Sequence, residues 1–485
     1  MLNLNFHKHY QHLLAISMML GSLAFGSCGK NLDINSPVTS TNNENVYSSD
    51  PTAAAVLTGI YITMSQGDFR TAGITSMSLF PALSADELTL FDLNNPAYAP
   101  YYRNELTNTN ALSSDFWLNI YPIIFTANAA IEGLRDNQTL TPVVQQQLLG
   151  EAKFIRAFCY FQLVNLYGDV PLALGTDFEQ NRLLPRAPQS QVWQQIITDL
   201  KEAQALLTDG YVKSDAMTVY PLDGEERVRP NKWAATALLA RSYLYRGEWA
   251  NAEAQASAVI GQVSLYGLEP LENVFLKNSR EAIWQLQPVR SGFNTQDAYL
   301  FMLPLGVNSD WPVYLSNNLV NSFEPGDKRK DSWVGKYTDA STDPVSDYYY
   351  AFKYKAFIDE PITEYTMVLR LGEQYLVRAE ARAQQGNISG SKSDLDIIRA
   401  RAGLGPDIAN DKNALLSAIL HERQIELFTE WGHRWLDLKR SGKVDDVMDQ
   451  VAQQKGGVWQ PSWQLYPIPL EELKKAPNLQ QNTGY

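Results

Sequence analysis

One long helical pattern, from Thr141 to Leu172, stands out in the distribution of hydrophobic and polar positions along the chain. Between residues 154 and 167 it is apolar almost all round, which predicts a helix inside a stack of other helices. The Thr141 hydroxyl is placed to cap its start, and Gly168 is placed to end it. Gly150 lies in the helix interior, where we expect a neighbouring helix to cross closely.

Apolar residues at helical spacing recur in further segments of the chain. The text WAATALLARSYLYRGEWANAEAQASAVI, residues 233–260, resembles a tetratricopeptide hairpin with Gly247 at its turn. Such helix pairs bury their faces only against neighbouring pairs. We therefore predict an all-α fold, an array of four tetratricopeptide-like pairs with little β structure. The predicted pairs are residues 52–63 with 114–134, 141–167 with 191–207, 231–247 with 249–260, and 366–385 with 390–400.

Two long stretches, residues 69–110 and 264–365, interrupt the helical pattern; the first is polar and aromatic, and the second is rich in Gly, Pro, Asn and aromatic residues. Irregular segments of this length inside a folded protein are usually functional. We therefore expect both to be loop-rich insertions that carry a binding site. Within them, only residues 281–287 alternate like a short strand.

Composition restricts the class of protein. Hydrophobic residues make up 45% of the chain and charged residues 19%, which is typical of a globular protein with a substantial core. The formal net charge of −13 argues against a nucleic-acid partner, because phosphate binding needs a basic face. The densest basic run, DKRKD at 327–331, is flanked by aspartates that cancel its charge.

The N-terminus has the pattern of an export signal. Residues 1–27 contain a short apolar run that ends in small residues before Cys28. The sequence Phe25-Gly26-Ser27-Cys28 resembles a lipobox, whose cysteine is acylated and becomes the new N-terminus. An ordinary cleavage site beside an incidental cysteine is the alternative. We expect a signal peptide over 1–27, a flexible polar tether over 28–50 and a single domain over 51–485.

Three carboxylates, Glu422, Glu426 and Glu430, fall on one helix face at four-residue spacing. Such a row repels itself unless cations meet it. We predict an internal ion-pair network in which Arg423, Arg434 or Arg440 supplies the positive charge. The alternative is a functional site that combines these carboxylates with His433.

Three blocks of sequence resemble the SusD/RagB family of surface lipoproteins, which capture nutrients for TonB-dependent transporters in Bacteroidetes. The blocks are FIRAFCYFQLVNLYGDVPL at 154–172, HERQIELFTEWGHRWLDLKRSG at 421–442 and LYPIPLEELKKAPNLQQNTGY at 465–485. The resemblance implies a protein on the outer membrane at the cell surface, held there by an N-terminal lipid anchor. It also implies a SusC-like TonB-dependent transporter as partner, and an oligosaccharide as ligand, with peptide as the alternative.

Catalytic chemistry has little support in the sequence. After the signal only His421 and His433 remain, so a multi-histidine metal site is excluded, and no nucleophile elbow or phosphate-binding loop is present. We therefore expect no enzyme, no catalytic residue, no metal and no cofactor. A glycan-cleaving enzyme stays as the alternative, because the separation of a carboxylate pair such as Asp86 and Glu87 is visible only in three dimensions.

Binding fits the composition of the two insertions better. Sugar rings present apolar C–H faces and hydroxyl rims, so a glycan site needs aromatic platforms beside polar side chains. The family resemblance implies that loops from these two regions form the ligand site. For each aromatic residue, packing in the core is the alternative. The candidate ligand-binding residues are Asn94, Tyr98, Tyr101, Tyr102, Trp311 and Tyr314.

Overall fold

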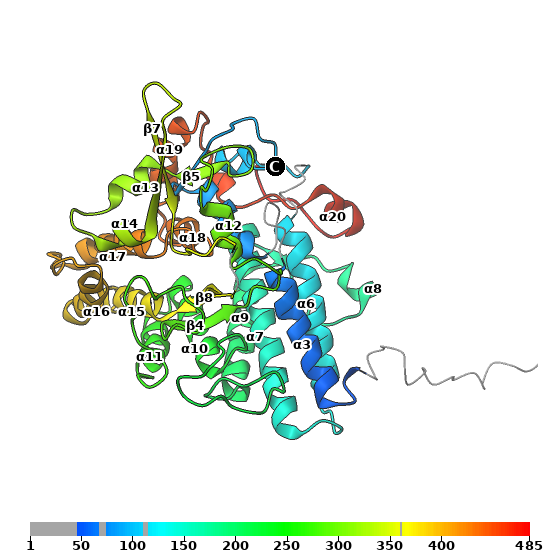
Figure 1. The fold of residues 1–485 in the computed structure, drawn as a ribbon. Coiled ribbons are helices and arrows are strands. Elements are labelled where there is room, and N and C mark those ends of the chain that lie inside the picture. Colours follow the sequence, from blue (N-terminus) through cyan, green and yellow to red (C-terminus); the bar gives the residue numbers. More distant parts are fainter. Residues whose placement is uncertain (1–45, 67–73, 110–114, 359–360) are drawn as a thin grey trace, which may run out of the picture. The chain divides into compact units, whose positions relative to one another are not determined.

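The central helix α7, Pro142–Tyr167, is buried along most of its length and is surrounded by other helices (Figure 1). The computed structural model describes residues 46–66, 74–109, 115–358 and 361–485. The predicted signal peptide, Cys28 and most of the predicted tether lie outside these ranges. Thr141 occupies the N-cap of α7, but its hydroxyl makes no capping bond; the Thr141 carbonyl accepts from the Gln145 amide instead.

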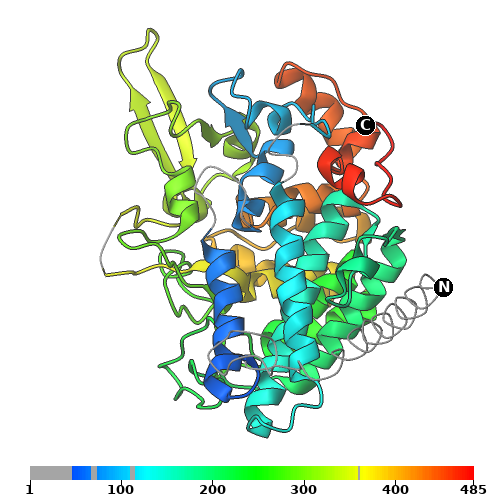
Figure 2. The same cartoon turned by 90° about the vertical axis from the view of Figure 1, so that its right-hand side faces the viewer.

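The predicted helix pairs are all present and in contact. Helix α3 contacts α6, α7 contacts α9, α10 contacts α11, and α15 contacts α16. Contacts between α6 and α7, α9 and α10, and α11 and α15 join the pairs into one array, and Figure 2 shows α3 beside α6. The predicted all-α fold is therefore confirmed. The bounds are α3 Asp50–Ser65, α6 Asp115–Leu134, α9 Gln189–Leu206, α10 Lys232–Tyr245, α11 Trp249–Ile260, α15 Leu371–Gln384 and α16 Ile388–Arg401.

Gly150 lies where the end of α9 crosses α7. A Cβ atom at this position would lie 2.9 Å from Leu207 Cγ and 3.1 Å from Leu206 Cβ. Both distances are shorter than ordinary carbon contacts, so the glycine allows the two helices to approach. The close crossing predicted at Gly150 is confirmed.

The described strands are short and form only two-stranded antiparallel ladders. One ladder corrects the predicted helix 366–385, because residues 366–370 form strand β8 and the helix starts at Leu371. β8 pairs with β4, which is the strand expected near residues 281–287. The strands are β1 Leu88–Leu90 with β5 Val313–Leu315, β2 Val170–Pro171 with β3 Arg186–Ala187, β4 Ala282–Leu286 with β8 Thr366–Arg370, and β6 Val334–Asp339 with β7 Ser346–Ala351.

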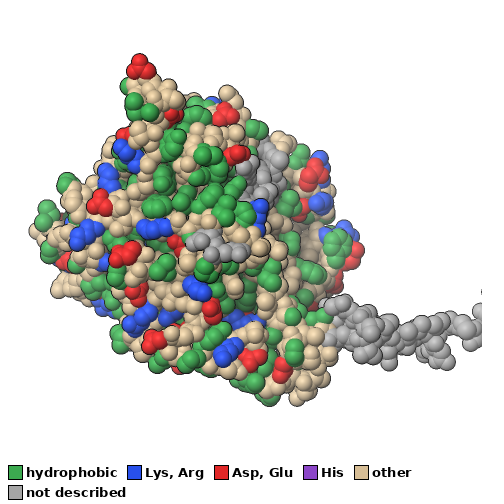
Figure 3. Space-filling model, viewed as in Figure 1, with side chains coloured by type: hydrophobic (Ala, Val, Ile, Leu, Met, Phe, Trp, Pro, Cys, Tyr) green, Lys and Arg blue, Asp and Glu red, His purple; other side chains and the backbone are tan. Residues whose placement is uncertain are grey.

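The two insertions contain more regular structure than expected. The described part of the first one, residues 74–109, folds into short, largely buried elements instead of a loop. The second one carries three short helices and the β6–β7 hairpin. On the side shown in Figure 3, hydrophobic side chains gather over β5, β7 and α12. These elements are η1 Ile74–Ser78, α4 Phe80–Ser84, α5 Ala99–Tyr102, α12 Gln296–Phe301, α13 Asn317–Ser322 and α14 Lys328–Trp333.

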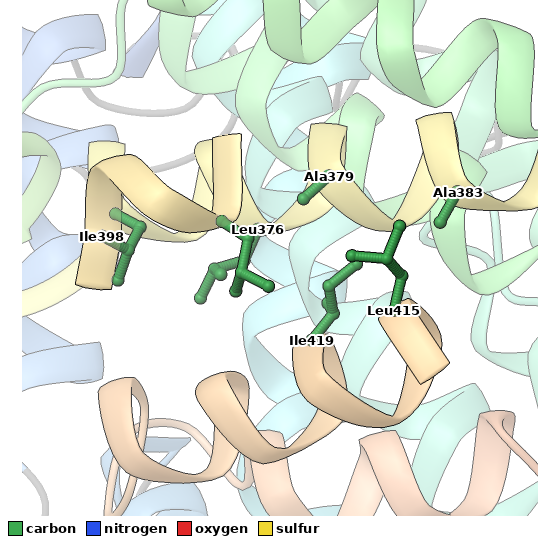
Figure 4. Packing of buried hydrophobic residues seen from close by; sticks show 7 residues of the cluster. Leu376, Ala379, Ala383, Ile398, Leu415 and Ile419 are labelled. Atoms are coloured by element: carbon green, nitrogen blue, oxygen red, sulfur yellow. The ribbon is translucent and has the colours of Figure 1, made fainter. Parts of the chain in front are cut away.

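The C-terminal helices close the array. A cluster of fully buried apolar side chains joins α15, α16 and α17 (Figure 4). Leu376 of α15 packs with Ile398 of α16 and Ile419 of α17 in this cluster. The remaining elements are α8 Phe178–Asn181, α17 Lys412–Glu426, α18 His433–Arg440, α19 Val444–Gln454, η3 Pro461–Gln464 and α20 Leu470–Lys475.

A buried ion-pair network connects the array to the second insertion. The guanidinium of Arg370, at the β8–α15 junction, lies 2.6 Å from Glu426, 2.8 Å from Glu430 and 2.9 Å from Glu281. Burial alone would raise the pKa of Glu426, but Arg401 and Arg370 outweigh it and hold this pKa well below its usual range. Glu426 therefore stays ionised inside the protein.

The network confirms the structural interpretation of the carboxylate row but corrects its partners. Glu422 and Glu426 pair with Arg329 at 2.5 and 2.9 Å, and Glu430 pairs with Lys353 as well as Arg370. The three predicted arginines pair with other carboxylates: Arg423 with Asp437, Arg434 with Asp86, and Arg440 with Asp437 and Glu380.

Replacing Arg370 with Met should destabilise the protein strongly, by about 3–5 kcal/mol, because three buried carboxylates lose a shared cation. Urea unfolding followed by circular dichroism measures this loss. The matched control is Arg182→Met at the exposed Arg182–Glu179 pair, where we expect a change of about 1 kcal/mol or less. Equal losses for the two variants would contradict the interpretation.

Candidate functional site

A short ladder brings the two insertions together. β1 lies in the first insertion and β5 in the second, and Leu88 pairs with Leu315 while Leu90 pairs with Val313. The ladder extends by one bond, in which the Phe91 amide donates to the Pro312 carbonyl at 2.8 Å. Side chains from segments far apart in the sequence therefore share one surface.

Three aromatic rings meet beside this ladder. The rings of Tyr314 and Tyr348 pack edge to face with their centroids 5.1 Å apart, and Phe91 lies 6.4 Å from Tyr348. Phe91 remains 48% exposed, which is unusual for a phenylalanine. Tyr348 comes from β7, where it pairs with Tyr337 of β6. The hairpin thus adds its own ring to the group.

A second group of half-buried rings surrounds Trp311. Tyr299 of α12 stacks on Phe357 with centroids 5.3 Å apart and planes 8° from parallel. Trp311 lies 6.0 Å from Phe357, and its indole N–H donates to the Tyr299 carbonyl at 3.1 Å. Phe293 packs against Tyr299 at 5.8 Å. These contacts fix the orientation of the indole ring.

We call the two groups together the aromatic face. The segment 311–314 links the groups along the chain, because Trp311 belongs to one of them and Tyr314, on β5, to the other. The face is part of the hydrophobic surface over β5, β7 and α12 in Figure 3. Its members are Phe91, Phe293, Tyr299, Trp311, Tyr314, Tyr348 and Phe357.

The structure separates the six residues chosen from the sequence. Trp311 and Tyr314 lie in the aromatic face, and Asn94 is exposed in the turn that follows β1. Tyr98 and Tyr102 are only 5% and 6% exposed.

Tyr101 has no exposed surface, and its ring packs 4.4 Å from Phe80 and 5.4 Å from Tyr466. Its ring is therefore part of the core, which is the alternative that the sequence left open. Helix α5, which carries Tyr101, packs against α4 beneath the surface.

Sequence reasoning missed Phe91, Tyr348 and Phe357 as members of the face. The tyrosine run of β7, Tyr348 to Tyr350, is a signal that was available, because aromatic residues favour strands and half-buried surfaces. Phe91 and Phe357 carry no local signal, because their neighbours in space come from distant segments.

The loop before β5 uses its polar groups internally. The Asn308 side-chain oxygen accepts from the backbone amides of Asp310 and Trp311, at 2.7 and 3.2 Å. Its side-chain nitrogen donates to the Gly306 carbonyl. Asn308 therefore holds the loop that presents Trp311 and is occupied by that role.

The carboxylates considered for glycan cleavage lie inside the protein. Asp86 receives two bonds from Arg434, at 2.7 and 2.8 Å, and Glu87 is 1% exposed and accepts from the Thr429 amide. Burial and the adjacent charge of Asp86 raise the pKa of Glu87 to about 8. This pair holds α18 to the first insertion and has no access to a glycan. No group of three metal-ligating side chains occurs among the described residues.

A buried carboxylate anchors the helix beneath Trp311. Asp297 lies in the first turn of α12 and accepts from the Ser78 hydroxyl at 3.2 Å, while its other oxygen accepts no bond from a described residue. Burial raises the pKa of Asp297 to about 7. This group therefore carries a proton in mildly acidic solution and loses it near neutral pH.

Two family models match the chain. One, described as starch-binding and associating with the outer membrane, matches residues 32–244, and the other, the SusD family, matches residues 314–485. The chain belongs to the SusD/RagB family. Neither of these models describes an enzyme, and outer-membrane association is part of the first description.

Similarity to SusD-like proteins extends over nearly the whole chain. A SusD-like protein of Formosa agariphila is 26% identical over an alignment that covers 99% of this chain and 100% of the relative. A crystal structure of a SusD superfamily protein from Bacteroides vulgatus has a TM-score of 0.77 at 22% identity, covering 90% of this chain and 99% of that one. A laminarin-binding SusD-like protein has a TM-score of 0.72 at 24% identity, covering 89% and 99%.

None of the described helices combines the length and the apolar character that crossing a bilayer requires.

Replacing Asp297 with Asn should flatten the pH dependence of stability. The folded wild type holds its Asp297 proton up to a pKa of about 7, above the ordinary value of 3.8, so its stability falls as pH rises between these values. The Asn variant lacks this loss. The unfolding free energy of the variant minus that of the wild type should therefore increase by on the order of 2–4 kcal/mol as the pH rises across that window. Urea unfolding at several pH values measures the difference.

The matched control for this series is Asp331→Asn, at an exposed carboxylate of α14. If the Asp297→Asn curve runs parallel to the wild-type curve from pH 4 to pH 8, then Asp297 does not titrate as its burial implies.

Proposed function

We propose that this protein binds oligosaccharides at the cell surface and delivers them to a TonB-dependent outer-membrane transporter. The observation that carries the proposal is the aromatic face, where two groups of partly exposed rings, seven in all, come from both insertions. Sugar rings stack their C–H faces on such aromatic surfaces. The tyrosine hydroxyls of the face offer hydrogen-bond partners for sugar hydroxyls.

Two aspects of the face favour an extended ligand. The group of rings around Tyr348 offers one platform and the group around Trp311 offers a second, so more than one sugar unit can stack on the face. Trp311 is held by its bond to Tyr299 and by the loop bonds of Asn308, so little side-chain freedom is lost on binding. The relative named for laminarin binding, which shares this fold, supports a glycan ligand.

Peptide is the runner-up ligand, because one branch of the family takes up peptides and aromatic faces accept both ligands. The acidic net charge of −13 does not separate them, since exposed charges are screened over about 8 Å at physiological salt. A glycan array beside a peptide library distinguishes the two directly.

Replacing Trp311 with Ala should weaken binding of an array-positive oligosaccharide by about 2 kcal/mol, roughly thirtyfold in Kd, because a central stacking platform is lost. Isothermal titration calorimetry measures Kd, and the thermal midpoint should stay within a few degrees. Trp249→Ala is the matched control, since Trp249 is also half-buried but lies on α11, outside the face. Wild-type affinity in Trp311→Ala, or binding of peptides alone, would refute the proposal.

Anchoring at Cys28 is expected to be required for retention at the membrane. Wild-type protein made in cells fed radioactive palmitate should carry label, and Cys28→Ala should not, because the acylated thiol is removed. Wild-type protein purified from detergent-solubilised outer membranes should bring a TonB-dependent barrel with it. Equal labelling of the two proteins argues against the anchor, and recovery without a barrel argues against the partner.

A further inference from the structure

A separate cavity of about 350 Å³ lies between α3, the segment 211–220 and the end of β4. Its lining shares no residue with the aromatic face. The volume is at the lower end of the range for small-molecule sites, which suits one ring of pyranose size and not a chain.

Three tyrosines form much of the wall of this cavity. Tyr61 of α3 donates its hydroxyl to Glu151 at 2.7 Å, and Tyr365 lies in the same wall as Glu226. Burial and the charge of Glu226 raise the pKa of Tyr365, so its hydroxyl keeps its proton and remains a donor. Tyr220 is half-buried and presents its ring from the opposite segment. The wall therefore combines apolar ring faces with fixed hydroxyl groups.

Glu226 is the unusual member of the lining. Its Oε2 atom is buried and accepts no hydrogen bond from any described residue. Arg229 is close by, but its guanidinium already donates to Glu151 at 2.6 Å and to the Thr58 hydroxyl at 2.7 Å. A buried carboxylate oxygen without a donor is unfavourable. Among the described residues, no donor reaches Glu226 Oε2, so this atom could accept a hydrogen bond from a ligand.

The formal charges in the cavity balance. Glu226 is negative and Lys213 is positive, with the Lys213 ammonium 5.5 Å from the centre of the Tyr220 ring. The charge of Arg229 is matched by Glu151, its salt-bridge partner. Glu226 would repel an anionic ligand, and Lys213 would repel a cationic one. A neutral ligand that donates hydrogen bonds and has an apolar face satisfies all of these groups.

We propose that this cavity is a second ligand site, which holds one neutral polyhydroxylated ring and receives a hydroxyl donor at Glu226 Oε2. The ring stacks on Tyr220, and Lys213 donates to its hydroxyl oxygens. The site does not depend on the oligosaccharide site, because it uses different residues. It gives the chain a small-sugar site of its own beside the extended aromatic face.

The test uses neutral methyl glycosides of glucose, galactose, mannose and xylose, with glucosamine and glucuronic acid as charged probes. Saturation-transfer NMR should detect at least one neutral glycoside on the wild type. Glu226→Gln should weaken its binding by about tenfold, because a charge-assisted hydrogen bond becomes a neutral one. Tyr220→Ala should weaken it as well, while Tyr220→Phe, which keeps the ring, should bind like the wild type.

The matched control is Glu179→Gln, the same chemical change at an exposed position on α8. Trp311→Ala should leave glycoside binding unchanged, so failure of the aromatic face and failure of this cavity give different results. The proposal is overturned if no neutral glycoside binds, if a charged probe binds better than all of them, or if Glu226→Gln binds like the wild type. Should Glu226→Gln fail to fold, the two Tyr220 variants decide the matter.

Discussion

A buried positive charge has to be surrounded by negative ones. At Arg370 this requirement joins the helix array to the second insertion. Leaving a buried ion without its partners costs several kcal/mol, so Glu281, Glu426 and Glu430 must all reach one guanidinium. Glu281 directly precedes β4, Glu426 ends α17, and Glu430 lies in the turn after α17. The helix array and the second insertion are therefore held in a single relative position, and the aromatic face is built on that insertion.

The helix array was predictable because its signal is local. Apolar spacing and turn glycines place each helix from a short window, and neighbouring helices in the chain are also neighbours in space. At residues 366–370 the sequence does not separate helix from strand, because a short apolar run fits a buried strand as well as a buried helix. The helices of the first insertion are too short to show a period in the sequence, because α4 has five residues and α5 has four.

The sequence did not indicate which residues from distant segments contact each other in the folded protein. Helical spacing showed that Glu422, Glu426 and Glu430 need cations, but the cations come from α14, β8 and α16 and not from the same segment. The same limit applies to the aromatic residues. Tyr101 and Trp311 look alike in composition and setting, yet Tyr466 and Phe80 enclose the first ring while the second stays at the surface.

The aromatic face lies on β5, β7, α12 and the loops beside them, outside the helix pairs. Its rings contact one another within each group, and the β1–β5 ladder that joins the two insertions is only three residues long on each strand. Exchanging residues on β7 or in the loop before β5 thus alters the shape offered to a ligand while the contacts between helix pairs persist. A scaffold built in this way separates the residues that set which ligand is preferred from the residues that set the architecture.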